Sequence, residues 1–526
     1  MNKSPLTWLR TTNSFWAKAL IGAVGGALAG LAYPRFDLWY LTYLGLPLVL
    51  ISLHRLGLFR SLWVGTIAGT AFYCIQLTWI SLYLGPIPLI ALSIMEGLFF
   101  GLGAVGISLA WRFIDQRNLG RRAAFLTAAI IATIWVGREY LSGHFPFSGF
   151  PWARIGVSQA DTPLANLVYW VDIAGLSWLI VYVCSLLTLR FISAPPSGAG
   201  LAKRVANYAP VLACGLALYL AAVATVIPVG AQSGTMNIAA AQGNANAGLF
   251  AINPPGSILL KHLAVSRKLL ATAKVPIDVM VWPENASDLD PISMPRVHQV
   301  LNSFVKNELK GTLIFGTKTI RDNKLYNEVV EWTPAGGAVD WYDKKIPVPF
   351  GEYVPNRSFF MSLAPSLIGM IVWDMSPGTR DGIFETPKGK LGSLICFEVV
   401  FDELSADLVD GGAEALLVQT NNSDFGHSDE TFQQVAVSRL RAIETGRSVV
   451  AVSTVGVSAI YRPDGTTQKM LPVFKPGAMV DSVALRTSKT PAMIFGRYIE
   501  IVSFFAALLL VLISAIAITA RKFKKH

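Results

Sequence analysis

Eight apolar segments constrain the fold of this chain more than any other feature of its 526 residues. Seven of them follow one another closely, and the eighth begins only after residue 495. Each approaches the roughly 20 residues that a helix needs to cross a bilayer. Only 15% of all residues are charged, against about 25% in ordinary soluble domains. We therefore predict eight transmembrane helices, near residues 15–33, 37–54, 61–84, 88–111, 123–141, 165–189, 209–228 and 497–520.

The net charge of +11 belongs to the apolar part of the chain. Residues 229–495 contain 24 Lys and Arg against 26 Asp and Glu, whereas the rest of the chain contains 20 and 7. A nucleic-acid-binding groove would concentrate positive charge on one folded surface. We therefore expect no nucleic acid partner.

The basic residues of the loops predict the orientation of the chain in the membrane. One set of loops holds sixteen of them: Lys3, Arg10, Lys18, Arg55, Arg60, Arg112, Arg117, Arg121, Arg122, Arg190, Lys203, Arg204, Arg521, Lys522, Lys524 and Lys525. The opposite set holds Arg35, Arg138 and Arg154. Because the richer side faces the cytoplasm, both termini are predicted to be cytoplasmic and residues 229–495 to lie outside the cytoplasm.

These patterns predict three parts. Residues 1–228 form a membrane domain with seven helices, residues 229–495 an extracytoplasmic domain, and residues 496–526 the eighth helix with a basic cytoplasmic tail. The first segment could also be a cleaved signal peptide, but seven further spans make that interpretation unnecessary. Its small residues Gly22, Gly26 and Gly30 recur every four positions, a spacing that lets helices approach closely in lipid.

Three acidic residues, Glu96, Glu139 and Asp172, fall within or at the edges of predicted spans. Acidic groups in a membrane are functional candidates, but a structural ion pair, such as Glu139 with Arg138, explains them equally well. We assign them no role. The loop at 142–163 is rich in aromatic residues, Pro and Gly, and is interpreted as a lid, a substrate contact or an interfacial loop.

Residues 229–495 alternate between strand-like and helix-like segments. Strands are predicted at 236–244, 275–285, 311–320, 326–333, 390–401, 413–422 and 448–461, helices at 257–274, 293–308, 402–411 and 429–445, and a turn at 462–465. This alternation is typical of an α/β fold with layered sheets.

Cys396 is the only cysteine of this domain, so no disulfide can form within it. The other three, Cys74, Cys184 and Cys214, lie in predicted spans. A lone thiol outside the cytoplasm is either a candidate nucleophile or a small core residue. Cys396 lies near the end of its predicted strand, where an α/β sheet tends to present reactive groups.

Charged residues follow other strand ends of the same domain. Glu284 lies in WPE, Lys344 and Glu352 lie in the loop YDKKIPVPFGEYVP, and Glu398 follows Cys396 by two positions. A carboxylate, an ammonium group and a thiol from three strand ends could converge. Taken alone, each residue is better explained by a structural role: a turn acid for Glu284, a solvated loop charge for Lys344, a salt-bridge partner for Glu352 and a surface position for Glu398.

Taken together, these motifs resemble a known superfamily. WPEN, YDKKIPVPFGEYVP and ICFE, in this order, resemble the Glu–Lys–Cys signatures of the nitrilase superfamily. The eight spans, with a domain inserted before the last, resemble the apolipoprotein N-acyltransferase family in particular. TNNSDFGH and SRLRAIETGR are also similar to segments of that family. The resemblance implies that the protein lies in the cytoplasmic membrane of a bacterium. It also implies that the extracytoplasmic domain is an α-β-β-α sandwich.

The resemblance also implies an activity. A fatty acyl chain would move from a phospholipid to the α-amine of the diacylglyceryl-cysteine at the N-terminus of an apolipoprotein. Glu284 would be the base, Lys344 the stabiliser of the oxyanion and Cys396 the nucleophile, with a thioester intermediate and ping-pong kinetics. Glu352 and Glu398 would orient the lysine and the base, Asn327 would support them, and a separate polyprenol-phosphate mannose synthase is a candidate partner. We further expect the Phe397 backbone N–H to be a second oxyanion donor.

Three positions depart from the family pattern. Phe250 is the nearest aromatic residue where members often have Trp, Phe397 replaces a frequent Tyr, and Phe425 is preceded by Asp424. These departures concern acyl-chain or headgroup contacts and leave the Glu–Lys–Cys set intact.

We expect no metal and no soluble cofactor. The histidines His144, His262, His298 and His427 are scattered, and no glycine-rich phosphate loop is present. Two alternatives stay open. One is a membrane-anchored nitrilase-type amidase, and the other is a transporter or scaffold with an external binding domain and no covalent chemistry.

Overall fold

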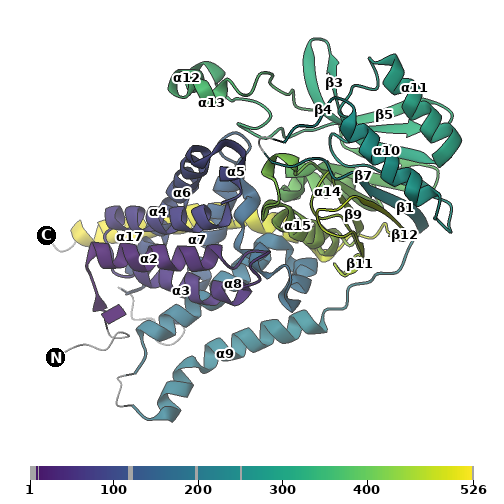
Figure 1. Ribbon diagram of the computed structural model, residues 1–526. Coiled ribbons are helices and arrows are strands. Elements are labelled where there is room, and N and C mark those ends of the chain that lie inside the picture. Colours follow the sequence, from purple (N-terminus) through teal and green to yellow (C-terminus); the bar gives the residue numbers. More distant parts are fainter. Residues whose placement is uncertain (1–7, 10, 116–122, 196–198, 249–250, 524–526) are drawn as a thin grey trace. The chain divides into compact units, whose positions relative to one another are not determined.

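The computed structural model describes residues 8–9, 11–115, 123–195, 199–248 and 251–523 (Figure 1). The chain divides into two compact units. The first comprises Met1–Ser81, Gly85–Val226 and Phe495–His526, and the second comprises Leu82–Leu84 and Ile227–Ile494. Some residues used in the sequence predictions lie outside the described residues, namely Lys3, Arg10, Arg117, Arg121, Arg122, Lys524, Lys525 and Phe250.

The first unit is helical. Its helices are α2 (Phe15–Gly30), α3 (Thr42–Leu53), α4 (Leu58–Gln76), α6 (Pro86–Asp115), α7 (Ala123–His144), α8 (Val168–Ile192), α9 (Leu201–Ala224) and α17 (Ile499–Phe523), and α5 (Ile80–Leu84) continues from it into the second unit. Six segments of the described chain are long and apolar enough to cross a membrane: Leu58–Gln76, Pro86–Arg112, Ala123–His144, Pro163–Ile192, Leu201–Ala224 and Gly496–Ala517.

Six of the eight predicted spans therefore have a helix of suitable length and composition. The first two predicted spans correspond to shorter apolar helices, Phe15–Gly30 and Trp39–Leu53. Both are shorter than the roughly 20 residues of a full crossing, so their crossing stays a prediction.

The small residues of α2 pack as their spacing predicts. A Cβ atom on Gly26 would lie 2.0 Å from the Ala68 carbonyl oxygen of α4, and one on Gly30 would lie 2.7 Å from the Phe72 carbonyl oxygen. A Cβ on Gly22 would lie 3.1 Å from Ser52 Oγ of α3. Glycine at these positions lets the helix backbones approach closely.

The structural interpretation accounts for Glu139. Its Oε1 atom accepts hydrogen bonds from Trp135 Nε1 at 2.9 Å and from the Ile155 backbone N–H at 3.0 Å, and it lies 3.8 Å from Arg138. Glu96 is fully buried near Tyr73 and Arg138.

Asp172 and the loop that precedes α8 have irregular backbone. Asp172 interrupts α8 with a left-handed conformation (φ 64°), and its carboxylate accepts the Ile173 N–H. The loop at 142–163 folds into short 3₁₀ turns, and most of it is buried, including Trp152 and Gln159. Phe145 is an exception, with 62% of its surface exposed.

The second unit contains two six-stranded sheets. One has the strand order β12-β1-β2-β3-β4-β5 and the other β11-β10-β9-β8-β7-β6. The bounds are β1 (Gly234–Gln242), β2 (Val279–Val281), β3 (Thr312–Arg321), β4 (Lys324–Thr333), β5 (Gly337–Asp343), β6 (Ile383–Thr386), β7 (Gly389–Ile395), β8 (Ala415–Thr420), β9 (Ser448–Ser453), β10 (Ala459–Tyr461), β11 (Thr467–Met470) and β12 (Gly477–Leu485). The central strands β1–β2–β3 and β7–β8–β9 are parallel, and the outer pairs are antiparallel.

The two sheets pack face to face between layers of helices. Their inner faces share one apolar core that includes Ile238 and Val281 from one sheet and Leu417 and Val450 from the other. Helices α10 (Ser257–Leu270) and α11 (Pro295–Ser303) cover the outer face of the first sheet, with Leu263 packed into a core that also contains strand residues. Helices α14 (Asp402–Asp410) and α15 (Glu430–Thr445) pack against strands of the second (Figure 1). The layered α/β architecture predicted from the sequence is confirmed.

Three strand predictions need correction. The strand predicted at 390–401 ends at Ile395, and Cys396–Val400 form a 3₁₀ helix. The strand predicted at 275–285 is limited to Val279–Val281. The segment 448–461 forms two antiparallel strands, β9 and β10, because the chain turns between them. The sequence patterns also did not predict β5, β6, β11, β12 or the short helices α12 (Arg357–Leu363), α13 (Pro365–Ile368) and α16 (Pro491–Ile494).

Candidate active site

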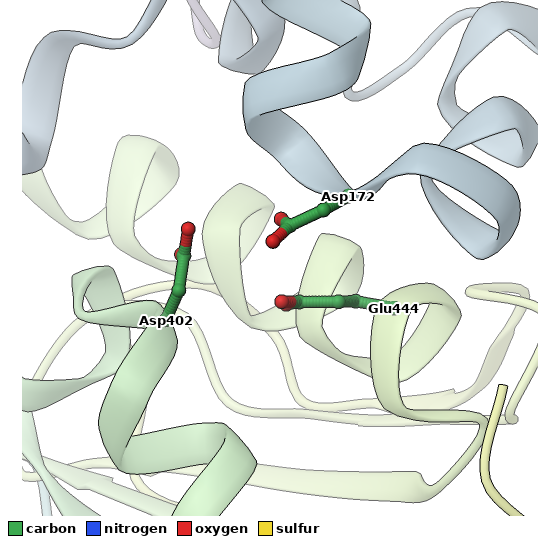
Figure 2. Close-up of side chains that lie close together, drawn as sticks. All are labelled: Asp172, Asp402 and Glu444. Carbon is green, nitrogen blue, oxygen red and sulfur yellow. The ribbon is translucent and has the colours of Figure 1, made fainter. Parts of the chain in front are cut away.

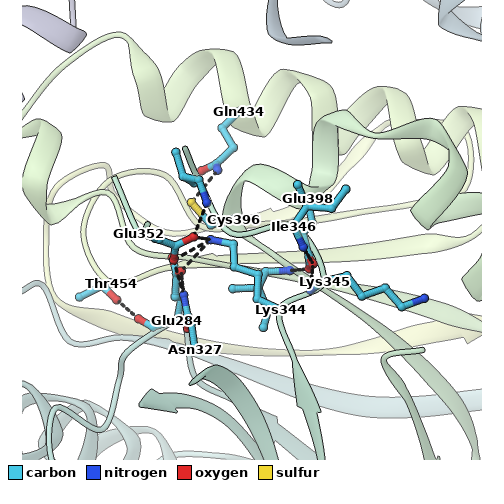
Figure 3. A network of polar contacts seen from close by, with 12 residues as sticks. Glu284, Asn327, Lys344, Lys345, Ile346, Glu352, Cys396, Glu398, Gln434 and Thr454 are labelled. Carbon is cyan, nitrogen blue, oxygen red and sulfur yellow. Dashed lines mark hydrogen bonds and ion pairs between the residues drawn. The ribbon is translucent and has the colours of Figure 1, made fainter. Parts of the chain in front are cut away.

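The predicted site residues lie at strand ends of the two facing sheets. Glu284 follows β2, Lys344 follows β5 directly, and Cys396 follows β7 directly. Asn327 lies within β4, and Glu352 lies in the loop after Lys344. The α/β layering therefore brings residues that are far apart in the sequence to one place (Figure 3).

Lys344 is the centre of a buried polar network. Its ammonium nitrogen lies 3.3 Å from Glu284 Oε1 and 2.9 Å from Glu352 Oε2. The side-chain amide of Asn327 donates to Oε1 of both glutamates, at 2.6 and 2.7 Å. The lysine backbone N–H donates to the Asn327 carbonyl oxygen at 2.8 Å, so the strand that carries Asn327 also fixes the lysine.

The network keeps opposite charges together away from water. Burial alone would lower the pKa of Lys344, but Glu284, Glu352 and Cys396 raise it above its ordinary value. Burial alone would raise the pKa of Glu352, but the Lys344 ammonium group and the Val348 N–H hold it below its ordinary value. Lys344 is therefore a fixed positive charge at the site.

Cys396 occupies a strained turn beside this network. Its φ of 55° lies in the left-handed region, which costs a non-glycine residue on the order of 1 kcal/mol. Burial raises the pKa of its thiol well above the ordinary value, as does the charge of Glu284, while Lys344 acts in the opposite direction. The side-chain amide of Gln434 donates to Sγ at 3.4 Å. The resting sulfur is therefore a thiol that must lose its proton to react.

Glu398 joins the loop that begins at Lys344, the lysine loop, to the 3₁₀ turn Cys396–Val400, the cysteine turn. Its Oε1 accepts from Tyr342 Oη at 2.9 Å and from the backbone N–H groups of Lys345 at 2.7 Å and Ile346 at 3.3 Å. Its Oε2 accepts from the Ile395 N–H at 2.8 Å. Burial raises the pKa of Glu398 to about 7, although these hydrogen bonds act against the increase.

Four further residues position the site and were not predicted from the sequence. Thr454 Oγ1 donates to the Glu284 carbonyl oxygen at 2.8 Å, and the Gln419 side chain donates to the Trp282 carbonyl oxygen at 2.7 Å. Tyr342 and Gln434 make the contacts described above. A polar residue inside an apolar run was a usable signal for Gln419, in AEALLVQTNN, and for Thr454, in SVVAVSTVG.

Other residues singled out in the sequence have contacts of their own in this unit. Phe397 is buried in the 3₁₀ turn, with its ring 5.1 Å from that of Phe401. Burial raises the pKa of Asp424, with a further contribution from Glu352 against Lys318. Three histidines pack against aromatic rings, His262 on Trp282, His298 on Trp332 and His427 on Phe474.

A buried arginine supports the turn that carries Cys396. Arg441 Nε donates to the Val399 carbonyl oxygen at 2.8 Å, and its guanidinium group pairs with Asp402 and Glu444. Figure 2 shows Asp402 at the start of α14 and Glu444 near the end of α15. Within the second unit these two carboxylates hold the buried guanidinium group in place.

Comparisons with known proteins follow the two units. Residues 25–186 match the family model of the apolipoprotein N-acyltransferase N-terminal domain, and residues 237–489 match that of carbon-nitrogen hydrolase. An apolipoprotein N-acyltransferase of Mycolicibacterium smegmatis is 31% identical over 94% of this chain and 85% of that protein. One from Azotobacter vinelandii is 28% identical over 92% of each. Among solved structures, an amidase from Nesterenkonia sp. is 16% identical, with a TM-score of 0.38 over 50% of this chain and 95% of that one.

Proposed function

Because this chain belongs to the apolipoprotein N-acyltransferase family, we propose that it transfers a fatty acyl chain from a phospholipid to the α-amine of the N-terminal diacylglyceryl-cysteine of apolipoproteins. The observation that carries this proposal is the buried network of Lys344, Glu284, Glu352 and Asn327 beside the Cys396 thiol. It supplies a base, an oxyanion stabiliser and a nucleophile together, as acyl transfer through a covalent intermediate requires.

The first half-reaction forms the thioester. Cys396 Sγ attacks the ester carbonyl of the phospholipid, and its proton passes to Glu284. The C–O bond to the glycerol then breaks, and Glu284 returns the proton to the departing glycerol oxygen. The products are the acyl-thioester and a lysophospholipid. Because the resting thiol is protonated, the base must act during the attack.

Lys344 stabilises the negative oxygen of the tetrahedral intermediate. Its charge is fixed by Glu284 and Glu352 before substrate arrives, so no reorganisation is needed during the reaction. The Phe397 N–H is the second donor. Loss of one such donor typically costs about 10²–10³ in rate.

The second half-reaction transfers the acyl chain to the apolipoprotein. The α-amine attacks the thioester, the N–C bond forms, the C–S bond breaks, and Glu284 passes a proton from nitrogen to sulfur. The thiol and the N-acylated lipoprotein result. The kinetics should be ping-pong, because the first product leaves before the second substrate reacts.

The apolar helices fit this chemistry, because both substrates are held in a bilayer. We place the chain in the bacterial cytoplasmic membrane with both termini in the cytoplasm and residues 229–495 outside it. The domains are 1–228, 229–495 and 496–526. The orientation rests on the loop charges. The names of the relatives give no support for a separate polyprenol-phosphate mannose synthase as a partner.

Intact-mass analysis tests the function. Purified wild type and the variants Cys396→Ala and Cys396→Ser are incubated with phospholipid. We expect the wild type to gain one fatty acyl mass that hydroxylamine removes, and the Ala variant to gain none. A diacylated lipopeptide should discharge the adduct from the wild type. A folded wild type that gains no adduct from any phospholipid would overturn the proposal.

A further inference from the structure

Helix α15 places a second acidic residue at the thiol. Gln434, which donates to Cys396 Sγ at 3.4 Å, lies on this helix, and Glu430 lies four residues before it, on the same face. Glu430 is only 1% exposed. Its charge acts on the Cys396 thiol, and the charge of Glu284 acts on it in turn, so the carboxyl lies within electrostatic reach of both reacting groups.

Glu430 is not used by the network around Lys344. Its Oε2 atom is buried and accepts no hydrogen bond from the described residues, and no described Lys, Arg or His forms an ion pair with it. A buried carboxyl group without a partner is costly. In a site that binds substrates, such a group is best explained by a ligand that supplies the missing partner.

The second half-reaction needs a proton acceptor beyond Glu284. An α-amine has a pKa of about 7.7–8.0, so it arrives mainly as an ammonium group. The ammonium nitrogen carries three protons, and the nitrogen of the product amide carries one. One of the two lost protons passes through Glu284 to the departing Cys396 sulfur. The other must leave the nitrogen before it can attack.

We propose that Glu430 binds the ammonium group of the acceptor beside the Cys396 thioester and takes this first proton. The inference rests on the function proposed above. Glu430 as carboxylate pairs with the ammonium group and accepts one proton, which leaves a neutral amine and a carboxylic acid. Glu284 then moves the second proton from nitrogen to sulfur. The resting Glu430 acid releases its own proton to water when the ammonium group binds, and the proton taken from nitrogen restores the acid, so charge and protons balance.

The environment of Glu430 suits this transfer. Burial raises the pKa of its carboxyl to about 8, with a smaller contribution from Glu284. This value is close to that of an α-amine, so the proton moves between the two groups with little change in free energy. A cation next to the carboxyl favours its ionised form, and the pairing therefore depends on the acceptor being an amine.

The two half-reactions test the proposal separately in the full-length protein. The variant is Glu430→Gln, which keeps the shape of a side chain that is largely uncharged at rest and should fold. Glu403→Gln, at an exposed position of α14, is the control for the same substitution. Thioester formation from phospholipid is measured by intact mass. The isolated acyl-enzyme is then discharged either by a diacylated lipopeptide or by hydroxylamine, which is already neutral.

We expect Glu430→Gln to form the thioester at the wild-type rate and to react with hydroxylamine at the wild-type rate. Its discharge by the lipopeptide should slow by about 10²-fold, the usual contribution of a positioned acid or base, and Glu430→Asp should recover part of this loss. If the lipopeptide discharges the acyl-enzyme of Glu430→Gln at the wild-type rate, the inference is overturned. An equal loss with hydroxylamine would also overturn it, because it would show a structural effect.

A binding measurement tests the pairing directly. Competition by the lipopeptide is compared with that of an analogue whose α-amine is replaced by hydrogen. We expect the wild type to prefer the amine by on the order of 10-fold or more, as for a hydrogen bond between charged groups, and Glu430→Gln to show no preference. The same preference in both proteins would refute the ammonium site. If the wild type forms no thioester at all, the proposed function fails and this inference fails with it.

Discussion

Replacement of Glu398 by Gln should separate the lysine loop from the cysteine turn. The carboxylate accepts hydrogen bonds from the Tyr342 hydroxyl and from the N–H groups of Lys345, Ile346 and Ile395, at 2.7–3.3 Å. All four partners are donors. A glutamine side chain has only one acceptor oxygen, so its NH₂ group must face at least one N–H donor.

The smallest cost arises when the amide oxygen keeps the three donors at Oε1. The NH₂ group then faces the Ile395 N–H, the residue immediately before the nucleophile. Loss of a hydrogen bond to a charged group costs about 1.5–3 kcal/mol. If the loss displaces Cys396 from its reactive position, the rate falls roughly 10- to 100-fold, since 1.4 kcal/mol corresponds to a factor of ten.

Two measurements check this prediction in the purified full-length protein above pH 7, where the carboxyl of Glu398 is mainly ionised. Thermal unfolding of the catalytic unit should shift down by about 3–10 °C, and thioester formation from phospholipid should slow as calculated. Glu385→Gln, on the exposed side of β6, is the control and should match the wild type. If Glu398→Gln unfolds and reacts as the wild type does, Glu398 does not tie the loop to the turn.

Three further predictions concern the thiol, the amide bridge and the membrane unit. Burial and Glu284 raise the pKa of Cys396, so the rate of its alkylation by iodoacetamide should rise with pH without a plateau below pH 9.0. The alkylation is followed on the tryptic peptide that contains Cys396. A plateau near neutrality would contradict a protonated resting thiol. Asn327→Leu removes the donors to Glu284 and Glu352 and should slow thioester formation about 10-fold or more, whereas an unchanged rate would show that Lys344 alone orients both acids. Gly26→Val should lower the unfolding temperature of the first unit, because even a Cβ atom at this position would lie 2.0 Å from the Ala68 carbonyl oxygen. An unchanged unfolding temperature would refute the close packing of α2 on α4.

The sequence predicted which residues meet better than it predicted the backbone that holds them. Glu284, Lys344, Glu352 and Cys396 could be named because each lies in a motif near a predicted strand end, whereas Asn327 was named from the resemblance alone. The strand containing Cys396 was drawn six residues too long, since ICFEVVF is apolar throughout and hydrophobic periodicity does not register a turn. The turn depends on two local facts, the left-handed φ of Cys396 and the contact of Glu398 with the Ile395 N–H.

The supporting residues could not be derived because their partners are set by topology. Tyr342 reaches Glu398 only because β5 forms the edge of one sheet and β7 lies in the other. Thr454 reaches Glu284 only because the chain turns after β9. Such contacts join residues from separate sheets, and no pattern within either segment specifies which strands will face each other.

Three carboxyl groups of this site, Glu352, Glu398 and Glu430, differ in their partners. Glu352 is next to the Lys344 ammonium group, and its pKa lies below the ordinary value. Glu398 has four donors but forms no ion pair with the described residues, and its pKa is about 7. Glu430 has no ion-pair partner among the described residues, and its pKa is about 8. Since burial raises all three, the number and charge of the partners decide which group is ionised at rest. Lys344 thus fixes a permanent anion at Glu352, whereas Glu430 on α15 forms no ion pair with the described residues and stays an acid that can exchange protons. A site built this way can keep its charges through thioester formation and still respond to a cationic acceptor, which is the order of events that two half-reactions at one cysteine require.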